Sequence, residues 1–119
     1  MPTTTGLIMK RGDIFFATLD PTRGSETQKT RPVIIVSNDA ANRAAALVSV
    51  VPLTSNVSNL HPFEVKLGAR ETGLSKDSKA MAQQVRTIDK SRLGSQRKGL
   101  VPALKMRQVD DALRLHLGL

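Results

Sequence analysis

Residues 31–39 read RPVIIVSND, and this stretch decides the class of fold. Pro32 has no amide hydrogen to donate, so it suits the start of a strand, and it favours an extended backbone at Arg31. Val33–Val36 follows as four β-branched residues that are apolar on both faces, as in a buried central strand. The polar SND that ends the stretch predicts a capped, short helix over Ala40–Ala44.

Four more strands are predicted on either side of this central strand. Each has β-branched or aromatic residues without a helical period, and polar loops at 20–30, 54–62 and 68–77 separate them. Residues 87–93 are expected to form a helical turn. The predicted strands are Gly12–Leu19, Ala46–Leu53, Phe63–Leu67 and Ser78–Arg86.

The last segment of the chain changes to a helical period. Apolar residues recur there at spacings of three and four, so an amphipathic helix is predicted from about Pro102 to Leu117. Gly118 fits its C-terminal stop, and His116 is expected to be a structural residue of this helix. The residues of the apolar face are Met106, Val109, Leu113 and Leu117.

These elements predict one small domain. The 119 residues are too few for two ordinary domains, and sequential strands with short connections favour antiparallel pairing. We therefore expect a small curved antiparallel β-barrel with the C-terminal helix packed against it. Residues 10–119 form this domain, residues 1–9 are expected to be a flexible tail, and exposed sheet edges favour a homodimer.

Charge predicts the class of partner. The formal net charge is +8, and residues 61–119 carry 12 Lys or Arg against 6 Asp or Glu. So basic a small protein favours polyanions, either nucleic acid or an acidic protein. The chain has no Cys, which suits a reducing compartment. It shows no apolar run long enough to span a membrane and no signal-peptide pattern, so a cytoplasmic location without a membrane span is expected.

Few kinds of catalytic site are compatible with this composition. Without Cys, and with only two His and scattered acidic residues, neither a metal site nor a cofactor is expected. An Arg at the start of one strand and a Thr at the end of another suit a phosphoryl centre instead. The guanidinium of Arg31 offers a planar fork of donors, and the hydroxyl of Thr54 can donate to a non-bridging phosphate oxygen. RNA brings its own nucleophile, the 2′-hydroxyl.

The order of short motifs along the chain carries a stronger signal than any one of them. The motifs are RGDI (11–14), LDP (19–21), GSE (24–26), RPV (31–33), SND (37–39), Asn42, VPLTS (51–55), HPF (61–63) and QVRTID (84–89). Their order resembles the signature of the MazF/PemK family of toxins, over about residues 10–119.

This resemblance implies an SH3-like barrel of the PemK/CcdB type with a C-terminal helix, usually in a homodimer. It implies a metal-independent endoribonuclease toxin of a toxin–antitoxin system that inhibits translation and growth. Such a toxin cuts single-stranded RNA at short sequences and leaves 2′,3′-cyclic phosphate and 5′-hydroxyl ends. The resemblance also implies an antitoxin partner with an acidic, flexible tail. Arg31 matches the family's catalytic arginine, Thr54 its catalytic threonine, and Glu26 a loop glutamate proposed to assist.

Seven further polar residues are candidates for contact with RNA. They lie in the loop expected to close over RNA, in the loop after Thr54 and near the last strand. The alternative for each is an ordinary solvated side chain. Two segments depart from the family pattern: residues 28–29 replace glycines of many members, and residues 79–82 (KAMA) are less apolar than usual. The candidates are Ser25, Gln28, Lys29, His61, Lys76, Lys79 and Gln84.

Interpretations from other classes remain open at this stage. One is a non-enzymatic toxin of the CcdB type, which binds gyrase with a similar barrel. Another is a basic nucleic-acid-binding module without turnover, which would bind RNA in a salt-sensitive way and leave it intact. A third is an inactive family member that only sequesters antitoxin, although the sequence shows no lesion at Arg31 or Thr54. Discrete RNA cleavage separates the ribonuclease from all three.

Overall fold

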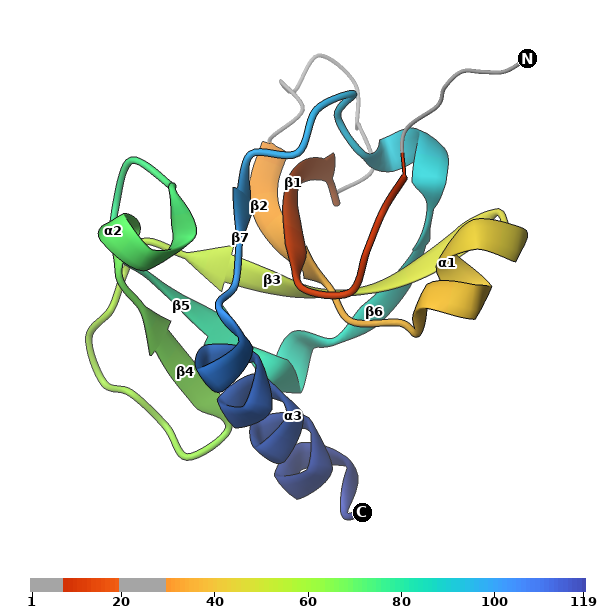
Figure 1. The fold of residues 1–119 in the computed structure, drawn as a ribbon. Coiled ribbons are helices and arrows are strands. Elements are labelled where there is room, and N and C mark those ends of the chain that lie inside the picture. The colour runs from red at the N-terminus through yellow and green to blue at the C-terminus, as the bar shows by residue number, and fades with distance from the viewer. Residues whose placement is uncertain (1–7, 20–29) are drawn as a thin grey trace, which may run out of the picture.

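The computed structural model describes residues 8–19 and 30–119. Within them an antiparallel sheet curls into a half-barrel, and helix α3 packs against it (Figure 1). The strands are β1 (Asp13–Thr18), β2 (Thr30–Ile35), β3 (Leu47–Thr54), β4 (Glu64–Leu67), β5 (Ser78–Met81), β6 (Arg86–Asp89) and β7 (Gly99–Leu100). The α-helices are α1 (Asp39–Ala44), α2 (Ala69–Thr72) and α3 (Ala103–Leu117).

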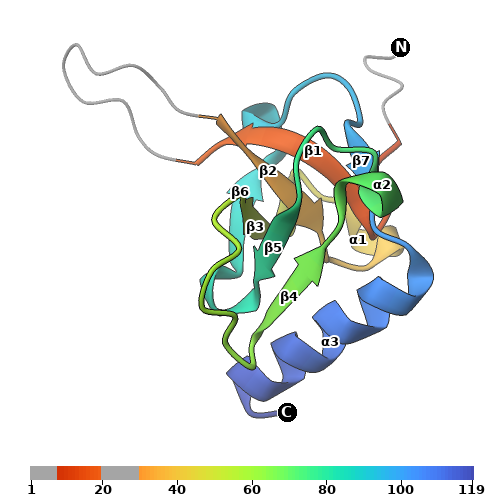
Figure 2. The ribbon, with the colours of Figure 1, turned by 90° about the vertical axis from the view of Figure 1, so that its left-hand side faces the viewer.

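Strand β3 is the centre of the sheet. The strand order is β4-β5-β3-β2-β1-β7, and β6 also pairs with β3. One edge of β3 pairs with β2, while its other edge pairs with β6 over residues 47–50 and with β5 over residues 53–54. Because two groups of strands share β3, they join into one curved layer, with α3 lying along β4 (Figure 2).

Two apolar clusters lie on the two faces of this layer. Successive residues of a strand point to opposite faces, so Ile34 enters one cluster while Val33 and Ile35 enter the other. The prediction of a central strand buried on both faces is confirmed. The first cluster includes Val51, Leu53, Val65, Leu67, Ala80, Met106, Val109 and Ala112, and the second includes Phe15, Ala17, Leu19, Val48, Val50 and Ile88.

The prediction of one continuous strand over Ser78–Arg86 is wrong. Strands β5 and β6 are separate, and a 3₁₀ turn lies between them. Ala80 lies opposite Leu53 and Arg86 lies opposite Val50, so this segment is longer than the part of β3 that it faces. The excess chain leaves the ladder and forms the turn.

Short elements also occupy segments predicted as loops or turns. Helix α2 lies inside the predicted loop 68–77 and ends at Gly73, whose φ of 85° is left-handed. The predicted turn at 87–93 begins as β6, and only Lys90–Arg92 forms a 3₁₀ turn. Strand β7 pairs with β1 although no strand was expected at Gly99. Elements of two to four residues are too short to show a period, so contacts with the rest of the fold decide them.

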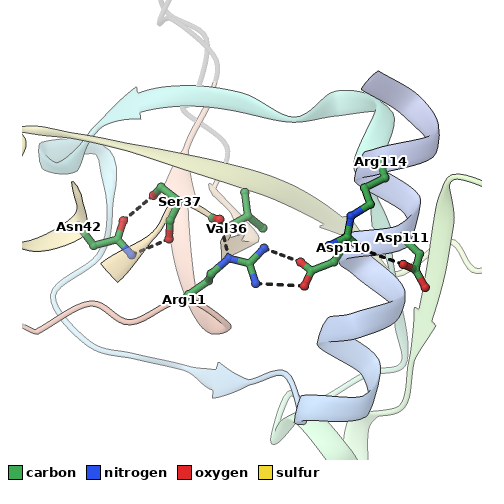
Figure 3. Close-up of polar contacts among 7 residues, drawn as sticks. All are labelled: Arg11, Val36, Ser37, Asn42, Asp110, Asp111 and Arg114. Atoms are coloured by element: carbon green, nitrogen blue, oxygen red, sulfur yellow. Dashed lines mark hydrogen bonds and ion pairs between the residues drawn. The ribbon is translucent and has the colours of Figure 1, made fainter. Parts of the chain in front are cut away.

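The prediction of a capped helix after the central strand is confirmed. The side chain of Asn38 accepts a hydrogen bond from the Ala41 amide at 2.8 Å, so it caps the first turn of α1. The side-chain amide of Asn42 donates to the Ser37 carbonyl oxygen at 2.9 Å (Figure 3). These bonds fix the exit of the chain from β2.

Arg11 ties the start of β1 to α3 (Figure 3). Its guanidinium donates to the Val36 carbonyl oxygen at 2.8 Å and forms an ion pair with Asp110 on the helix. Asp111 points elsewhere and accepts from Arg114 at 3.0 Å, as expected for adjacent positions on a helix. The helix is therefore held by a polar contact as well as by its apolar face.

The apolar face of α3 is shorter than predicted. Met106 and Val109 are buried, but Leu117 is 54% exposed. His116 is also exposed and lies beside Phe63, the residue before β4, at a ring separation of 6.5 Å. The turn that carries Leu117 therefore passes the end of the sheet, and His116 packs beside Phe63 at the surface.

Candidate functional site

Arg31 and Thr54 lie at the ends of neighbouring strands. In the β2–β3 ladder Val33 lies opposite Pro52, and the same register continued outward places Arg31 opposite Thr54. Since side chains on a strand alternate between faces, both residues project on the face that carries Val33 and Pro52. Arg31 and Thr54 thus lie at the ends of two paired strands, where β2 begins and β3 ends.

Arg31 is exposed and lines a small hollow of about 250 Å³. Gln84 and Arg86 supply the other polar side chains of the hollow, and Leu19 and Pro52 supply the apolar ones. Two guanidinium groups suit a phosphate, and an amide beside an apolar surface suits the edge and face of a base. The hollow therefore has the chemistry of a nucleotide site.

Thr54 is held in a defined orientation by the loop that follows it. Its Oγ1 accepts a hydrogen bond from the Asn56 amide at 3.2 Å, and the Asn56 side chain accepts one from the Ser58 amide at 3.1 Å. A hydroxyl that accepts through its oxygen keeps its own proton to donate. Thr54 can therefore donate this proton to a phosphate oxygen that comes within hydrogen-bond distance.

Lys79 was predicted to attract phosphate, but its ammonium is engaged inside the protein. Nζ lies 2.9 Å from a carboxylate oxygen of Glu64 and donates to the Ser58 carbonyl oxygen at 2.8 Å. Lys79 is only 8% exposed and Glu64 only 7%. We therefore treat Lys79 as half of a buried ion pair and leave it out of the RNA contacts proposed below.

The carboxylate of Glu64 has several donors. Besides Lys79, the His61 amide donates to it at 3.0 Å and the side-chain amide of Gln83 donates at 2.7 Å. Burial by itself acts to raise the pKa of Glu64, but these hydrogen bonds and the charge of Lys79 outweigh it and lower the pKa to about 2. The Glu64 carboxylate is therefore ionised at neutral pH.

Lys76 lines a second cleft of about 420 Å³. Pro32 and Ser55 line the same cleft, and they are the chain neighbours of Arg31 and Thr54. Because neighbouring residues of a strand face opposite ways, this cleft borders the Arg31–Thr54 pair from the other side of the sheet. The remaining lining residues are Phe16, Gly73, Leu74, Ser75, Ser78 and Lys98.

His61 lies in the loop between β3 and β4. It is exposed, and its ring stacks on Phe63 with a centroid separation of 5.5 Å and an angle of 15° between planes. Flat rings of this kind can stack on a base. His61 lines neither of the two hollows described above.

Four predicted site residues lie outside the described residues: Ser25, Glu26, Gln28 and Lys29. They belong to the segment that joins β1 to β2. Leu19, the last described residue before this segment, lines the Arg31 hollow. Thr30, the first described residue after it, is the chain neighbour of Arg31.

Sequence reasoning missed several residues that shape the site. Arg86 lines the hollow with Gln84, and its place two residues later in the same QVRTID motif is the signal that could have identified it. Asn56 orients Thr54, and Glu64 and Gln83 surround Lys79. No sequence pattern indicates these last contacts, because they join residues of different strands and loops.

Residues 8–19 and 30–119 contain no group of three His, Cys, Asp or Glu residues that could hold a metal ion. No helix there is long and apolar enough to cross a bilayer. Two of the carboxylates instead pair with single cations, Glu64 with Lys79 and Asp110 with Arg11.

The sequence matches one known protein family over most of its length. The profile of the PemK-like, MazF-like toxins of type II toxin–antitoxin systems matches residues 10–117. The chain belongs to this family. The resemblance inferred from the order of motifs is thereby confirmed.

Related proteins match over almost the full chain. The sequence is 46% identical to the endoribonuclease MazF9 of Mycobacterium tuberculosis over 117 residues, which cover 94% of this chain and 98% of that protein. It is 38% identical to the endoribonuclease EndoA of Bacillus subtilis over 114 residues, which cover 95% and 97%. The chain is therefore a MazF-type endoribonuclease toxin, and the gyrase-binding alternative is not supported.

Solved structures show the same fold. A chain of a MazE–MazF crystal structure from Deinococcus radiodurans is similar with a TM-score of 0.80 at 28% identity, covering 95% of this chain and 98% of that one. A mycobacterial endoribonuclease in complex with its cognate antitoxin has a TM-score of 0.72 at 30% identity, covering 94% and 95%. The predicted small antiparallel barrel with a C-terminal helix is confirmed, in the form of the curled MazF half-barrel.

Proposed function

We propose that this toxin cleaves single-stranded RNA at short specific sequences without a metal ion or cofactor. The observation that supports the proposal is the β2–β3 ladder, beyond whose last pair, Val33 with Pro52, Arg31 and Thr54 each stand two residues further along their strands. RNA supplies the nucleophile, so the protein has to orient the phosphate, stabilise its added charge and transfer protons. Attack of the 2′-hydroxyl on the adjacent phosphorus expels the 5′-oxygen. The products are a 2′,3′-cyclic phosphate and a 5′-hydroxyl.

In this proposal Arg31 and Thr54 act on the same phosphate. The guanidinium of Arg31 donates hydrogen bonds to the phosphoryl oxygens, including the leaving 5′-oxygen, and stabilises the charge that develops there. Thr54 donates its hydroxyl proton to a non-bridging oxygen, in the orientation set by Asn56. Glu26 is the proposed acceptor of the 2′-hydroxyl proton, since arginine stays protonated and is a poor base. Arg31 is the proposed donor of the proton that the leaving 5′-oxygen gains as a hydroxyl, and it takes a proton back from water.

Neighbouring nucleotides are proposed to occupy the two hollows. Gln84 and Arg86 contact the nucleotide beside Arg31, and Lys76 attracts a phosphate on the other side of the strand ends, as their positions in the hollows support. The stacked ring of His61 is available to a further base. The remaining proposed RNA contacts are Ser25, Gln28 and Lys29.

We also propose that an antitoxin with an acidic, flexible tail competes with RNA for this basic surface. The net charge of +8 supports both ligands. Related toxins have been solved in complex with a cognate antitoxin and with MazE. The toxin is proposed to act in the cytoplasm as a homodimer and to inhibit translation and growth. Exposed apolar side chains at the end of α3, Leu115 and Leu117, support the dimer.

The test is cleavage of a long single-stranded RNA in excess EDTA, with mapping of the cut positions and the chemistry of the ends. Arg31→Ala and Thr54→Val remove the two proposed catalytic groups. Arg43→Ala is the matched control, because Arg43 is exposed in α1, beyond the other end of β2. We expect discrete cuts with the wild type and with Arg43→Ala, and loss of cleavage with the other two variants.

Two results would contradict this proposal. Cleavage that stops in EDTA and returns with added magnesium would place a metal in the reaction. Cuts that leave 5′-phosphates, or that persist in both Arg31→Ala and Thr54→Val, would show that another group or contaminant does the chemistry.

A further inference from the structure

A continuous series of contacts joins the Thr54 hydroxyl to a buried ion pair. The Asn56 amide donates to Thr54 Oγ1 at 3.2 Å, and the Ser58 amide donates to the Asn56 side chain at 3.1 Å. The carbonyl oxygen of the same Ser58 accepts from Lys79 Nζ at 2.8 Å. Lys79 Nζ lies 2.9 Å from Glu64. Every step from the hydroxyl to the carboxylate is thus a direct contact.

The residues of this series share one face of the sheet. Thr54 lies opposite Lys79 in the β3–β5 ladder, and Lys79 lies opposite Lys66 in the β5–β4 ladder. Residues that pair across a ladder point to the same face, and Glu64 joins them because it is two residues from Lys66. The loop after Thr54 lies over this face, because Ser58 bonds to Lys79 and His61 bonds to Glu64.

Each partner of the ion pair binds a backbone group of that loop. Ser58 and His61 are its two anchor points, one on the cation and one on the anion, and Gln83 donates to the carboxylate from the turn after β5. Taking both charges out of water is costly, and such pairs often contribute a defined conformation more than net stability. A neutral, apolar pair of side chains would fill the same space but would leave the Ser58 carbonyl without its donor.

We infer that the Lys79–Glu64 pair is a positioning device for the reaction, which fixes residues 55–61 so that Asn56 holds the Thr54 hydroxyl toward the scissile phosphate. This inference rests on the proposed role of Thr54 as a donor to that phosphate. Lys79 and Glu64 touch no substrate in this scheme and act only through the loop. Their loss should therefore slow the chemical step more than it weakens RNA binding.

The test compares kcat and KM of purified variants on one short RNA that contains the cleavage sequence. Lys79→Met and Glu64→Gln are combined, so that no uncompensated charge stays in the interior. Lys66→Met is the matched control, because Lys66 lies directly opposite Lys79 but is exposed. We expect the double variant to lose about 10- to 100-fold in kcat with little change in KM. The control should keep the kcat of the wild type.

Three further measurements separate positioning from a general effect on the fold. Hydrogen exchange at the Asn56 and Ser58 amides should accelerate in the double variant while the amides of β2 and β3 stay protected. In a Thr54→Val background the same double substitution should change the residual rate less than about twofold, because it acts through Thr54. Lys79→Arg, which keeps the charge and donors, should recover most of the wild-type kcat.

Three outcomes would overturn the inference. They are an unchanged kcat in the folded double variant, an equal loss of kcat in the Lys66→Met control, and a full additional loss in the Thr54→Val background. Failure of the proposed function looks different, because the wild type itself would then leave the RNA intact or would not depend on Thr54.

Discussion

Replacement of Glu64 by Gln should remove a pH-dependent part of the stability of this protein. The pKa of Glu64 is lowered from 4.5 to about 2, so the unfolded chain binds its proton at a higher pH than the folded chain does. The stabilisation is therefore fully present above pH 4.5 and is lost as the pH falls from 4.5 towards 2. Each tenfold change in a dissociation constant corresponds to about 1.4 kcal/mol. The whole change corresponds to about 3 kcal/mol, which solvent screening in so small a protein reduces to about 1–2 kcal/mol.

The assay is urea unfolding of the wild type and Glu64→Gln at several pH values between 7 and 3. The free energy of unfolding of the wild type should exceed that of the variant by about 1–2 kcal/mol at pH 7, and the difference should shrink as the pH falls below 4.5. Lys79→Met offers a second check, because it leaves the buried Glu64 carboxylate without its cation. That variant should be less stable than the double variant Lys79→Met/Glu64→Gln at pH 7.

If the free energies of unfolding of the wild type and Glu64→Gln differ by the same amount at every pH in this range, the reasoning is refuted. A difference that grows as the pH falls would also refute it, because it would mean that the folded state raises the pKa of this carboxyl. A change in the slope of free energy against urea concentration would point instead to a changed unfolded state.

Three further predictions follow from single contacts. Arg31→Lys keeps a positive charge but loses the planar fork, so kcat on a fixed RNA should fall about 100-fold; activity near that of the wild type would mean that only charge matters at this position. Gly99→Ala should lower the free energy of unfolding by about 1–3 kcal/mol, because the new Cβ would lie 2.6 Å from the Thr72 carbonyl oxygen, and an unchanged urea midpoint would contradict it. Asn38→Ala removes the bond from the Ala41 amide and should cost about 1 kcal/mol in the same assay, whereas Asn38→Asp should cost much less.

Much of the fold was predictable because the long elements carry a period. The run Val33–Ile35 is apolar on both faces and lies between two clusters, as expected. The helix over Ala103–Leu117 was predicted within one residue of its start, although its last apolar residue is exposed. The break between β5 and β6 was not predictable, because it depends on where each strand meets β3 and not on the residues of the segment itself.

Some residues of the candidate site were likewise predictable from the sequence, whereas the contacts of others were not. Arg31 and Thr54 were identified by residue type and motif order, and in the structure each stands two residues beyond Val33 and Pro52, the last pair of the β2–β3 ladder. Lys79 was misjudged because lysine is usually exposed. Only the meeting of β4, β5 and the β3–β4 loop supplies the Glu64 carboxylate and the Ser58 carbonyl that bind its ammonium.

The family, the sheet class, the terminal helix and the two residues best suited to a phosphoryl centre were all determined by the amino-acid sequence. These features depend on local properties: residue chemistry, period and the order of motifs along the chain. Which side chains meet was decided by the folded structure, including the pairing of Lys79 with Glu64 and the gathering of Arg31, Gln84 and Arg86 around one hollow. Such contacts escape a local pattern because they depend on strand register and sheet curvature, which come from packing of the whole sheet.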